Sequence, residues 1–274
     1  MAREIGQIPD AVERLVRDGL GPVRAAAAEL RRADPAWVTF VARGTSDHAA
    51  IYGRYLVETR LGIPAGLAAA SVTTVYGSRL RWSGGAVIAI SQSGRSPDLR
   101  AVVEAARAGG AATLAITNDP SSPLADAAAT CIPVLAGPEH AVAATKTYVA
   151  CLVAVAALVA LTAEDRATLA ALPTLPDALA TALRLAGPWV SGSGIVESFA
   201  ASDRALVTSR GYDLATALEI AIKLQETAGL FADGHSTADL EHGPVALAAP
   251  SVPVLAVRPD GAMGASIVTA NALM

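Results

Sequence analysis

The sequence is poor in charged residues, aromatic residues and cysteines. Of its 274 residues, 17% are charged and 4% are aromatic, and only two are cysteines, Cys131 and Cys151. Neither cysteine has a second cysteine or a histidine at the spacing of a metal site. Both are therefore interpreted as small, buried apolar residues of a protein in the reducing cytosol.

Basic clusters and long apolar segments are also missing. The net charge is −4 and the isoelectric point is near 5.6, so neither nucleic acid nor an anionic membrane is expected as a partner. An anionic small substrate is compatible with this net charge, because a local site can be positive on an acidic protein. The longest apolar run, Val149 to Leu161, is too short to span a bilayer. Since the first ten residues lack the apolar core of a secretory signal, we expect a cytoplasmic protein without a membrane segment.

Apolar residues, by contrast, make up 53% of the chain, which is typical of a compact globular protein. Short apolar runs that predict strands alternate with segments of helical periodicity. Strands are expected at residues 36–42, 64–69, 86–90, 112–117, 130–135 and 205–208, and the longer helices at 47–60, 97–108 and 145–161. This alternation predicts an α/β fold in which crossover helices join the strands of a parallel sheet.

Glycine and proline indicate where this pattern is broken. Residues 11–33 have helical periodicity, but Gly19 and the pair Gly21-Pro22 interrupt it, so two short helices are expected there. Residues 162–192 contain three prolines among short helical patterns. We interpret that segment as a linker with helices.

The second half of the chain repeats the first. Gly44 and Gly211 each follow a predicted strand and lie 167 residues apart, and the same offset lays Gly94 on Gly261. Two strand–turn pairs at one offset predict two tandem three-layer α-β-α domains with parallel sheets. The next strand of the second copy would begin after Met274, so this copy is expected to be incomplete. The domains are predicted as N-terminal helices 1–35, a first domain 36–162, a linker with helices 163–192 and a truncated second domain 193–274.

A hydroxyl-rich turn between a buried strand and an amphipathic helix is the most informative motif. It runs from Ser91 to Ser96, and Pro97 then occupies the first helical position. A helix N-terminus favours an anion, and serine hydroxyls supply further neutral donors for a phosphate monoester. The alternative is a turn that only caps the helix. The second copy has Arg258-Pro259-Asp260 in place of the first hydroxyls.

Five motifs together resemble one family. They are Gly44-Thr45-Ser46, Ser91 to Ser96, Ala143-Ala144-Thr145-Lys146, Lys223-Leu224-Gln225-Glu226 and Glu241-His242-Gly243-Pro244. Their order resembles the sugar isomerase (SIS) family, in particular the isomerase half of glucosamine-6-phosphate synthase and the stand-alone SIS-type glucosamine-6-phosphate deaminases. The resemblance covers nearly the whole chain.

The resemblance implies a role for each motif. It implies that Glu226 moves a proton between C1 and C2 of the sugar, that His242 opens the sugar ring, and that Lys223 belongs to the same site. Ala144 stands where the synthase has a serine, which weakens a sugar-hydroxyl contact there. The implied phosphate ligands are Ser46, Ser91, Gln92, Ser93 and Ser96, and the further substrate contacts are Gly44, Thr45, Ala143 and Ala144.

The charged residues also have structural interpretations. Lys223 and Glu226 are three residues apart on a predicted helix, so they could form a surface ion pair, although the apolar neighbours favour a cleft and a carboxylate able to act as a base. A lone histidine in a polar turn such as that of His242 is usually a surface residue, but the Gly-Pro context and Glu226 upstream favour a catalytic role. Glu139 and Lys146 are equally compatible with charge pairing at a helix end and with a site role. His48 and His235 are interpreted as structural or peripheral.

The expected reaction converts glucosamine-6-phosphate into fructose-6-phosphate and ammonia, with no metal or redox cofactor. A plain aldose–ketose phosphosugar isomerase and a non-catalytic sugar-phosphate-binding regulator are the alternatives. The resemblance implies a homodimer in which His242 reaches the site of the other subunit. It also places a site-closing C-terminal tail with a lysine beyond Met274, so the chain as given is expected to bind sugar phosphate but to turn it over poorly.

Overall fold

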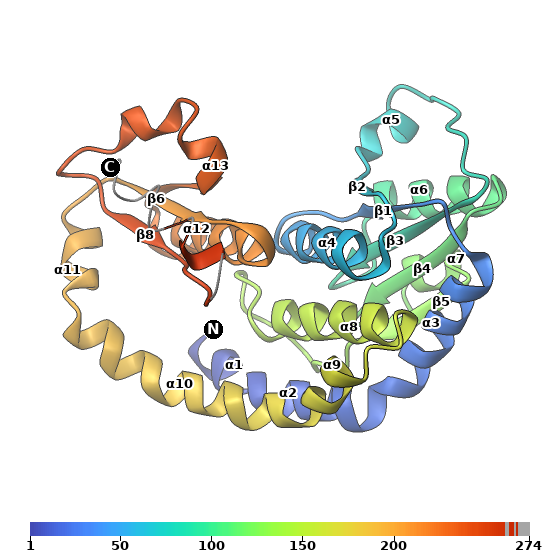
Figure 1. Cartoon of the computed structure of the whole chain (residues 1–274), viewed down its shortest axis with the longest axis horizontal. Coiled ribbons are helices and arrows are strands. Elements are labelled where there is room, and N and C mark those ends of the chain that lie inside the picture. Colours follow the sequence, from blue (N-terminus) through green and yellow to red (C-terminus); the bar gives the residue numbers. More distant parts are fainter. Residues whose placement is uncertain (261–262, 266, 268–274) are drawn as a thin grey trace. The chain divides into compact units, whose positions relative to one another are not determined.

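The chain forms two compact units, Met1–Ala180 and Thr181–Met274, in a computed structural model (Figure 1). The structure describes residues 1–260, 263–265 and 267. In this part of the chain no helix is long and apolar enough to cross a membrane.

A five-stranded sheet is the centre of the first unit. Its strands are β1 (Trp37–Val41), β2 (Ala65–Leu67), β3 (Gly85–Ser91), β4 (Ala112–Thr117) and β5 (Thr130–Pro133). The order is β2-β1-β3-β4-β5, and every pairing is parallel. Every residue of β3 is buried, as expected for a central strand covered on both faces. The predicted α/β fold with a parallel sheet is confirmed.

Helices cover both faces of this sheet (Figure 1). On one face, Phe40 of β1 packs where Gly53 of α4 (Thr45–Leu56) and Val155 of α8 (Lys146–Thr162) approach it. On the other face, Val87 and Ala89 share an apolar core with the amphipathic α6 (Pro97–Ala108) and with α7 (Pro123–Ala127). The short α5 (Ala70–Thr74) packs against α6. Cys131 lies half-buried in β5 and Cys151 is buried in α8.

The N-terminal helices differ from the prediction. Helix α1 (Ala2–Gly6) precedes α2 (Ile8–Arg14), and a π-helical turn at Leu15–Gly19 joins α2 to α3 (Leu20–Ala33), so this helix is not broken at Gly19 or Gly21. A Cβ at Gly19 would lie 2.7 Å from Leu15 Cδ1, so glycine here permits close packing. Pro22 lies in the first turn of α3, directly after the π-helical turn, and its ring has no N–H to donate to that preceding turn.

The segment predicted as a linker is also more regular than expected. It contains α9 (Arg166–Ala171), a 3₁₀ turn at Leu172–Thr174 and the 18-residue helix α10 (Leu175–Gly192). Two of its three prolines occupy the first turn of a helix, where proline favours helix initiation. Pro188 lies inside α10, so the prediction of short helices was wrong here.

The second unit contains a three-stranded parallel sheet of order β7-β6-β8. Its strands are β6 (Arg204–Ser209), β7 (Phe231–Ser236) and β8 (Val254–Ala256), and its helices include α11 (Ile195–Ala200), α12 (Leu214–Ala228) and α13 (Thr237–Leu240). Short 3₁₀ turns lie at Gly211–Asp213 and Pro244–Leu247. The strand expected after residue 274 lies outside the described residues.

Candidate active site

The strand order reverses between β1 and β3. The chain runs from β1 to β2 on one side and then crosses back to continue through β3, β4 and β5 on the other. Because β1 and β3 are parallel neighbours, with Val41 opposite Ala89, the turns that follow them lie at the same edge of the sheet. In open α/β sheets, ligands bind in the crevice at such a switch point. The sheet therefore brings together two motifs that lie more than forty residues apart in the sequence.

The turn after β1 contains a glycine, Gly44, at which any other residue would strain the backbone. Gly44 has φ +55° and ψ −132°, and it is the residue before α4. A Cβ there would meet no atom within 4 Å, so the space beside this backbone is open. Thr45 and Ser46 follow in a half-buried first helical turn, and the Ser46 N–H donates to the Arg43 carbonyl at 3.2 Å.

The turn after β3 is tightly folded around its own serines. The Gly94 N–H donates to Ser91 Oγ at 3.1 Å, and the Arg95 N–H donates to Ser93 Oγ at 3.3 Å. Gly94 has φ +62°, and a Cβ there would lie 2.0 Å from Ser122 Oγ. The turn therefore tolerates only glycine, and its serine oxygens are oriented by its backbone.

The helix that follows this turn begins without a side-chain cap. Ser96 is the residue before α6 and its hydroxyl makes no capping hydrogen bond. The 12-residue α6 therefore presents Ser96 and the half-buried Ser93 and Gln92 at one turn, while the Leu99 N–H in its first turn donates to Asp98 Oδ1 at 2.9 Å. Side-chain groups of this kind suit a phosphate, and their role as phosphate ligands stays a prediction.

Two arginines flank the turns, and each is held by a carboxylate. Arg43 Nη2 lies 2.6 Å from Asp98 Oδ2, and Arg95 Nη2 lies 3.3 Å from Asp119 Oδ2. Hydrogen bonds from Ser121, and further ones from Arg95, lower the pKa of the exposed Asp119 carboxyl. Asp98 and Arg43 were not singled out from the sequence, because nothing local indicates that residues 55 apart form an ion pair.

A carboxyl group of the first turn is partly desolvated. Burial raises the pKa of Asp47 in the first turn of α4, and the nearby charges of His48 and Arg43 oppose that shift. Where this carboxyl is ionised, its charge on the residue after Ser46 weakens the attraction for an anion.

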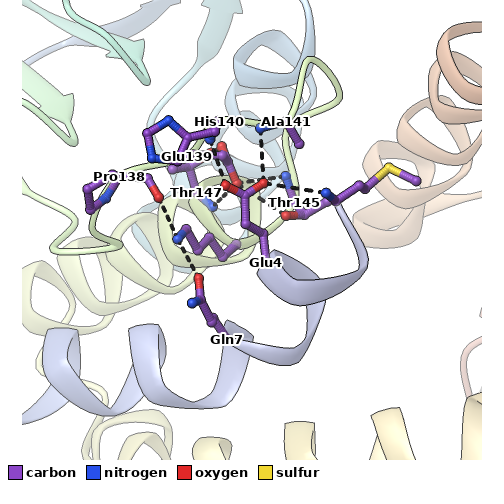
Figure 2. Close-up of polar contacts among 10 residues, drawn as sticks. Glu4, Gln7, Pro138, Glu139, His140, Ala141, Thr145 and Thr147 are labelled. Carbon is purple, nitrogen blue, oxygen red and sulfur yellow. Dashed lines mark hydrogen bonds and ion pairs between the residues drawn. The ribbon is translucent and has the colours of Figure 1, made fainter.

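The loop between β5 and α8 carries Ala143 and Ala144, and Figure 2 shows the polar contacts of its other residues. Ala143 is buried and Ala144 half-buried. Glu139 accepts hydrogen bonds from the Thr145 N–H at 3.0 Å and from the hydroxyls of Thr145 and Thr147. This carboxylate therefore occupies the N-terminus of α8. Lys146, 3% exposed, donates to Gln7 Oε1 and to the Pro138 carbonyl, each at 2.7 Å.

Lys223 and Glu226 lie in the second unit on α12. Lys223 Nζ is 2.6 Å from Glu226 Oε2 and 3.4 Å from Glu219 Oε1. Glu219 is 6% exposed and was not identified from the sequence, although its spacing of four residues from Lys223 indicates the contact. The lysine therefore holds one buried and one more exposed carboxylate on the same helix face.

His242 follows α13 and is exposed. Its backbone N–H donates to the Asp239 carbonyl at 3.0 Å, and within the described residues no hydrogen bond or ion pair joins it to Lys223 or Glu226. His235 instead lies 3.0 Å from Asp233. The structure thus places Glu226 and Lys223 in contact and leaves His242 apart from them.

These features define a doubly wound α/β protein whose hydroxyl-rich turns meet at the switch point of a parallel sheet. The SIS domain family matches residues 33–161 and 198–273, and the chain belongs to this family.

Similar curated proteins agree with this family assignment. The chain is 34% identical over 271 residues to isomerizing glutamine–fructose-6-phosphate aminotransferase of Gloeobacter violaceus, covering 93% of this chain and 43% of that protein. The enzyme of the same name from Symbiobacterium thermophilum is 36% identical, with 92% and 42% covered. The chain therefore spans less than half the length of these relatives.

Solved structures give the same fold. A Silicibacter pomeroyi protein assigned to the phosphosugar isomerases is 41% identical with a TM-score of 0.92, covering 98% of this chain and 80% of that one. Glucosamine-6-phosphate deaminase from Thermotoga maritima has a TM-score of 0.76 at 19% identity, with 99% and 81% covered. At that identity the likeness concerns the fold alone.

Proposed function

We propose that the protein binds a hexose or hexosamine 6-phosphate and isomerises it, with glucosamine-6-phosphate as substrate and fructose-6-phosphate and ammonia as products. The observation that carries the proposal is the meeting of the Gly44–Ser46 and Ser91–Ser96 turns beside the uncapped N-terminus of α6. Hydroxyls, amides and the helix dipole there suit a phosphate dianion. The names of the relatives support the same substrate class.

The proposed chemistry is a proton transfer followed by hydrolysis. His242 opens the pyranose, and Glu226 removes the proton from C2 of the open-chain amino sugar. The resulting enolamine takes a proton at C1, which leaves an imine at C2. Water then adds to that imine and ammonia leaves, so one water is consumed for each ammonia released. Lys223, 2.6 Å from Glu226, orients the carboxylate for the proton transfer.

A plain aldose–ketose isomerase is the second candidate, because the similar curated proteins are named isomerizing enzymes. The same proton transfer on glucose-6-phosphate would give fructose-6-phosphate without ammonia. The decisive assay supplies glucosamine-6-phosphate or glucose-6-phosphate and measures ammonia and fructose-6-phosphate. Ammonia from the first substrate supports the deaminase. Turnover of the second substrate alone supports the isomerase, and binding without turnover of either supports a regulator.

A homodimer with His242 supplied by the partner remains part of the proposal. It is tested by mixing two inactive variants, Glu226→Gln and His242→Asn. If the histidine crosses the interface, half of the randomly mixed dimers contain one intact site, so activity returns to about a quarter of the wild-type value. A mixture as inactive as its components, in a protein shown to be dimeric, would contradict an exchange of His242.

A further inference from the structure

A group of buried polar side chains joins the N-terminal helices to the loop before α8 (Figure 2). Glu4 is 7% exposed and Lys146 is 3% exposed, and neither has a part in the proposed chemistry. Residues as polar as these are rarely buried unless other groups compensate their charge. Their partners therefore indicate what the group does.

Glu4 binds the backbone of the loop with both of its oxygens. Oε1 accepts from the His140 N–H at 2.6 Å, and Oε2 accepts from the Ala141 N–H at 3.1 Å. The two amides are consecutive, so one carboxylate fixes the direction of the chain immediately before Ala143. Hydrogen bonds of this kind, with an ionised acceptor, are shorter and stronger than those between neutral groups.

Lys146 and Glu139 fix the other end of the loop. Lys146 Nζ donates to Gln7 of the N-terminal helices and to the carbonyl of Pro138, each at 2.7 Å. Glu139 accepts from the N–H groups of Thr145 and Thr147 at 3.0 and 3.3 Å. The loop is thus held at its start, its middle and its end by side chains and not by regular secondary structure.

Hydrogen bonds with Arg14 and Asn118 also hold the first part of the loop, residues 134–137. Val142, at its tip, is 97% exposed, and residues 134–145 form neither helix nor strand. The loop starts at the carboxyl end of β5, the edge of the sheet at which the serine turns lie, and it ends at α8, which packs against α4. Ala143 and Ala144 therefore lie on a loop that leaves the same edge of the sheet as the serine turns.

We propose that Glu4 is a positioning residue of the sugar site: it holds the segment Pro138–Thr145 so that Ala143 and Ala144 face the sugar, with Gln7 and Lys146 in support. This inference rests on the proposed function. The hydrogen bonds from His140 and Ala141, together with the charge of Lys146, lower the pKa of Glu4, so the carboxylate stays ionised well below neutral pH.

The experiment compares Glu4→Gln with wild type. Glutamine has one acceptor oxygen and directs an NH₂ group at a backbone N–H, so one of the two loop bonds is lost. The KM for the sugar phosphate is expected to rise about tenfold while kcat changes less than threefold. The affinity for inorganic phosphate, measured by calorimetry, stays unchanged because the serine turns are intact. Glu13→Gln on α2 is the matched control, because Glu13 is exposed and pairs only with Arg17 at 3.9 Å.

Further readouts separate positioning from mere stability. Amide exchange at His140 and Ala141 is expected to accelerate in Glu4→Gln without substrate. Gln7→Met removes one acceptor of Lys146 and is expected to raise the KM in the same direction but less, should Glu4→Gln fold poorly. A lower melting temperature with an unchanged KM in both variants overturns the inference. If the wild type itself does not bind phosphate, the proposed function is refuted. In that case faster amide exchange in Glu4→Gln would still support the anchoring of the loop by Glu4.

Discussion

The two sheets of this protein share a strand order but not the chemistry of their turns. The order β2-β1-β3 of the first unit recurs as β7-β6-β8 in the second, and β6 begins 167 residues after β1. Gly44 and Gly211 both have positive φ, at +55° and +67°. The backbone that forms a switch-point crevice is therefore present in both units.

The side chains in the two crevices differ. A Cβ at Gly44 would meet nothing within 4 Å, whereas a Cβ at Gly211 would lie 3.2 Å from Met263 Cγ. At the repeat offset Met263 is the counterpart of Ser96, and Asp213 is the counterpart of Ser46. A thioether and a carboxylate thus replace two hydroxyls. The two units thus share a strand order and differ in the side chains that we propose bind the anion.

The largest expected effect separates catalysis from binding. Glu226→Gln is expected to lower kcat by about 10²–10⁴-fold, since a general base is lost, while the affinity for inorganic phosphate stays as in wild type because the serine turns lie in the other unit. Steady-state kinetics and calorimetry measure the two quantities. Glu197→Gln, on the exposed face of α11, is the control, and an unchanged kcat in Glu226→Gln would remove this residue from the mechanism.

The next largest effect is expected from a substitution that displaces the Ser91–Ser96 turn of the first unit. Gly94→Ala places a Cβ 2.0 Å from Ser122 Oγ at a φ of +62°, which costs about 2–4 kcal/mol of unfolding free energy. Phosphate affinity is expected to fall about 100-fold, because the turn that orients Ser91 and Ser93 is displaced.

Gly110→Ala is the matched control for that change. Gly110 also has positive φ, at +87°, but no atom lies within 4 Å of its Cβ position. Denaturation should show a smaller loss of about 1–2 kcal/mol, and phosphate titration should show none. Equal phosphate affinity in both variants would mean that the Ser91–Ser96 turn does not bind the anion.

A smaller effect comes from exchanging the side chains of the two crevices. Ser96→Met is expected to weaken phosphate binding about tenfold, because it removes a donor and fills the space with a thioether. The reciprocal Met263→Ser should leave phosphate binding unchanged, since Arg258 to Asp260 supply no hydroxyls. Titration of both variants with inorganic phosphate sharpens the comparison. Equal weakening by the two changes would argue against a site confined to the first unit.

The smallest effect concerns Asp47 and Asp213, whose pKa values burial raises above the ordinary 3.8. A raised carboxyl pKa means that the ionised form costs stability above the folded-state pKa, and that this cost disappears as the pH falls through that value. Asp47→Asn should therefore raise the denaturation midpoint slightly at pH 7 and not at pH 3. It should also tighten phosphate binding about twofold at low salt, and Asp213→Asn should leave it unchanged.

The sequence predicts the elements whose signals are local. The apolar runs locate β1, β3 and β4 to within one or two residues, and the helix predicted at 145–161 is α8 at Lys146–Thr162. The hydroxyl-rich turn also stands beside Gly44–Ser46 as the parallel order requires. Such features depend on burial and on backbone conformation, which a short segment encodes.

Features that depend on distant partners could not be predicted. Glu4 binds amides 136 residues away, and Arg43 pairs with Asp98 across 55 residues. Gly19 looked like a helix break, yet it packs under Leu15 in a π-helical turn. The implied meeting of Glu226 with His242 of a partner likewise depends on an assembly that no local pattern encodes, and it stays a prediction.

The burial of the two cysteines makes the protein convenient for site-specific labelling. Burial, together with the charge of Glu139, raises the pKa of Cys151 to about 12, and burial also raises the pKa of Cys131. Because maleimides react with the thiolate, both native thiols react slowly at neutral pH. A cysteine introduced at the exposed Val142 would therefore take up a fluorophore selectively in an otherwise unaltered chain. Its emission would follow the movements of the Pro138–Thr145 segment in real time.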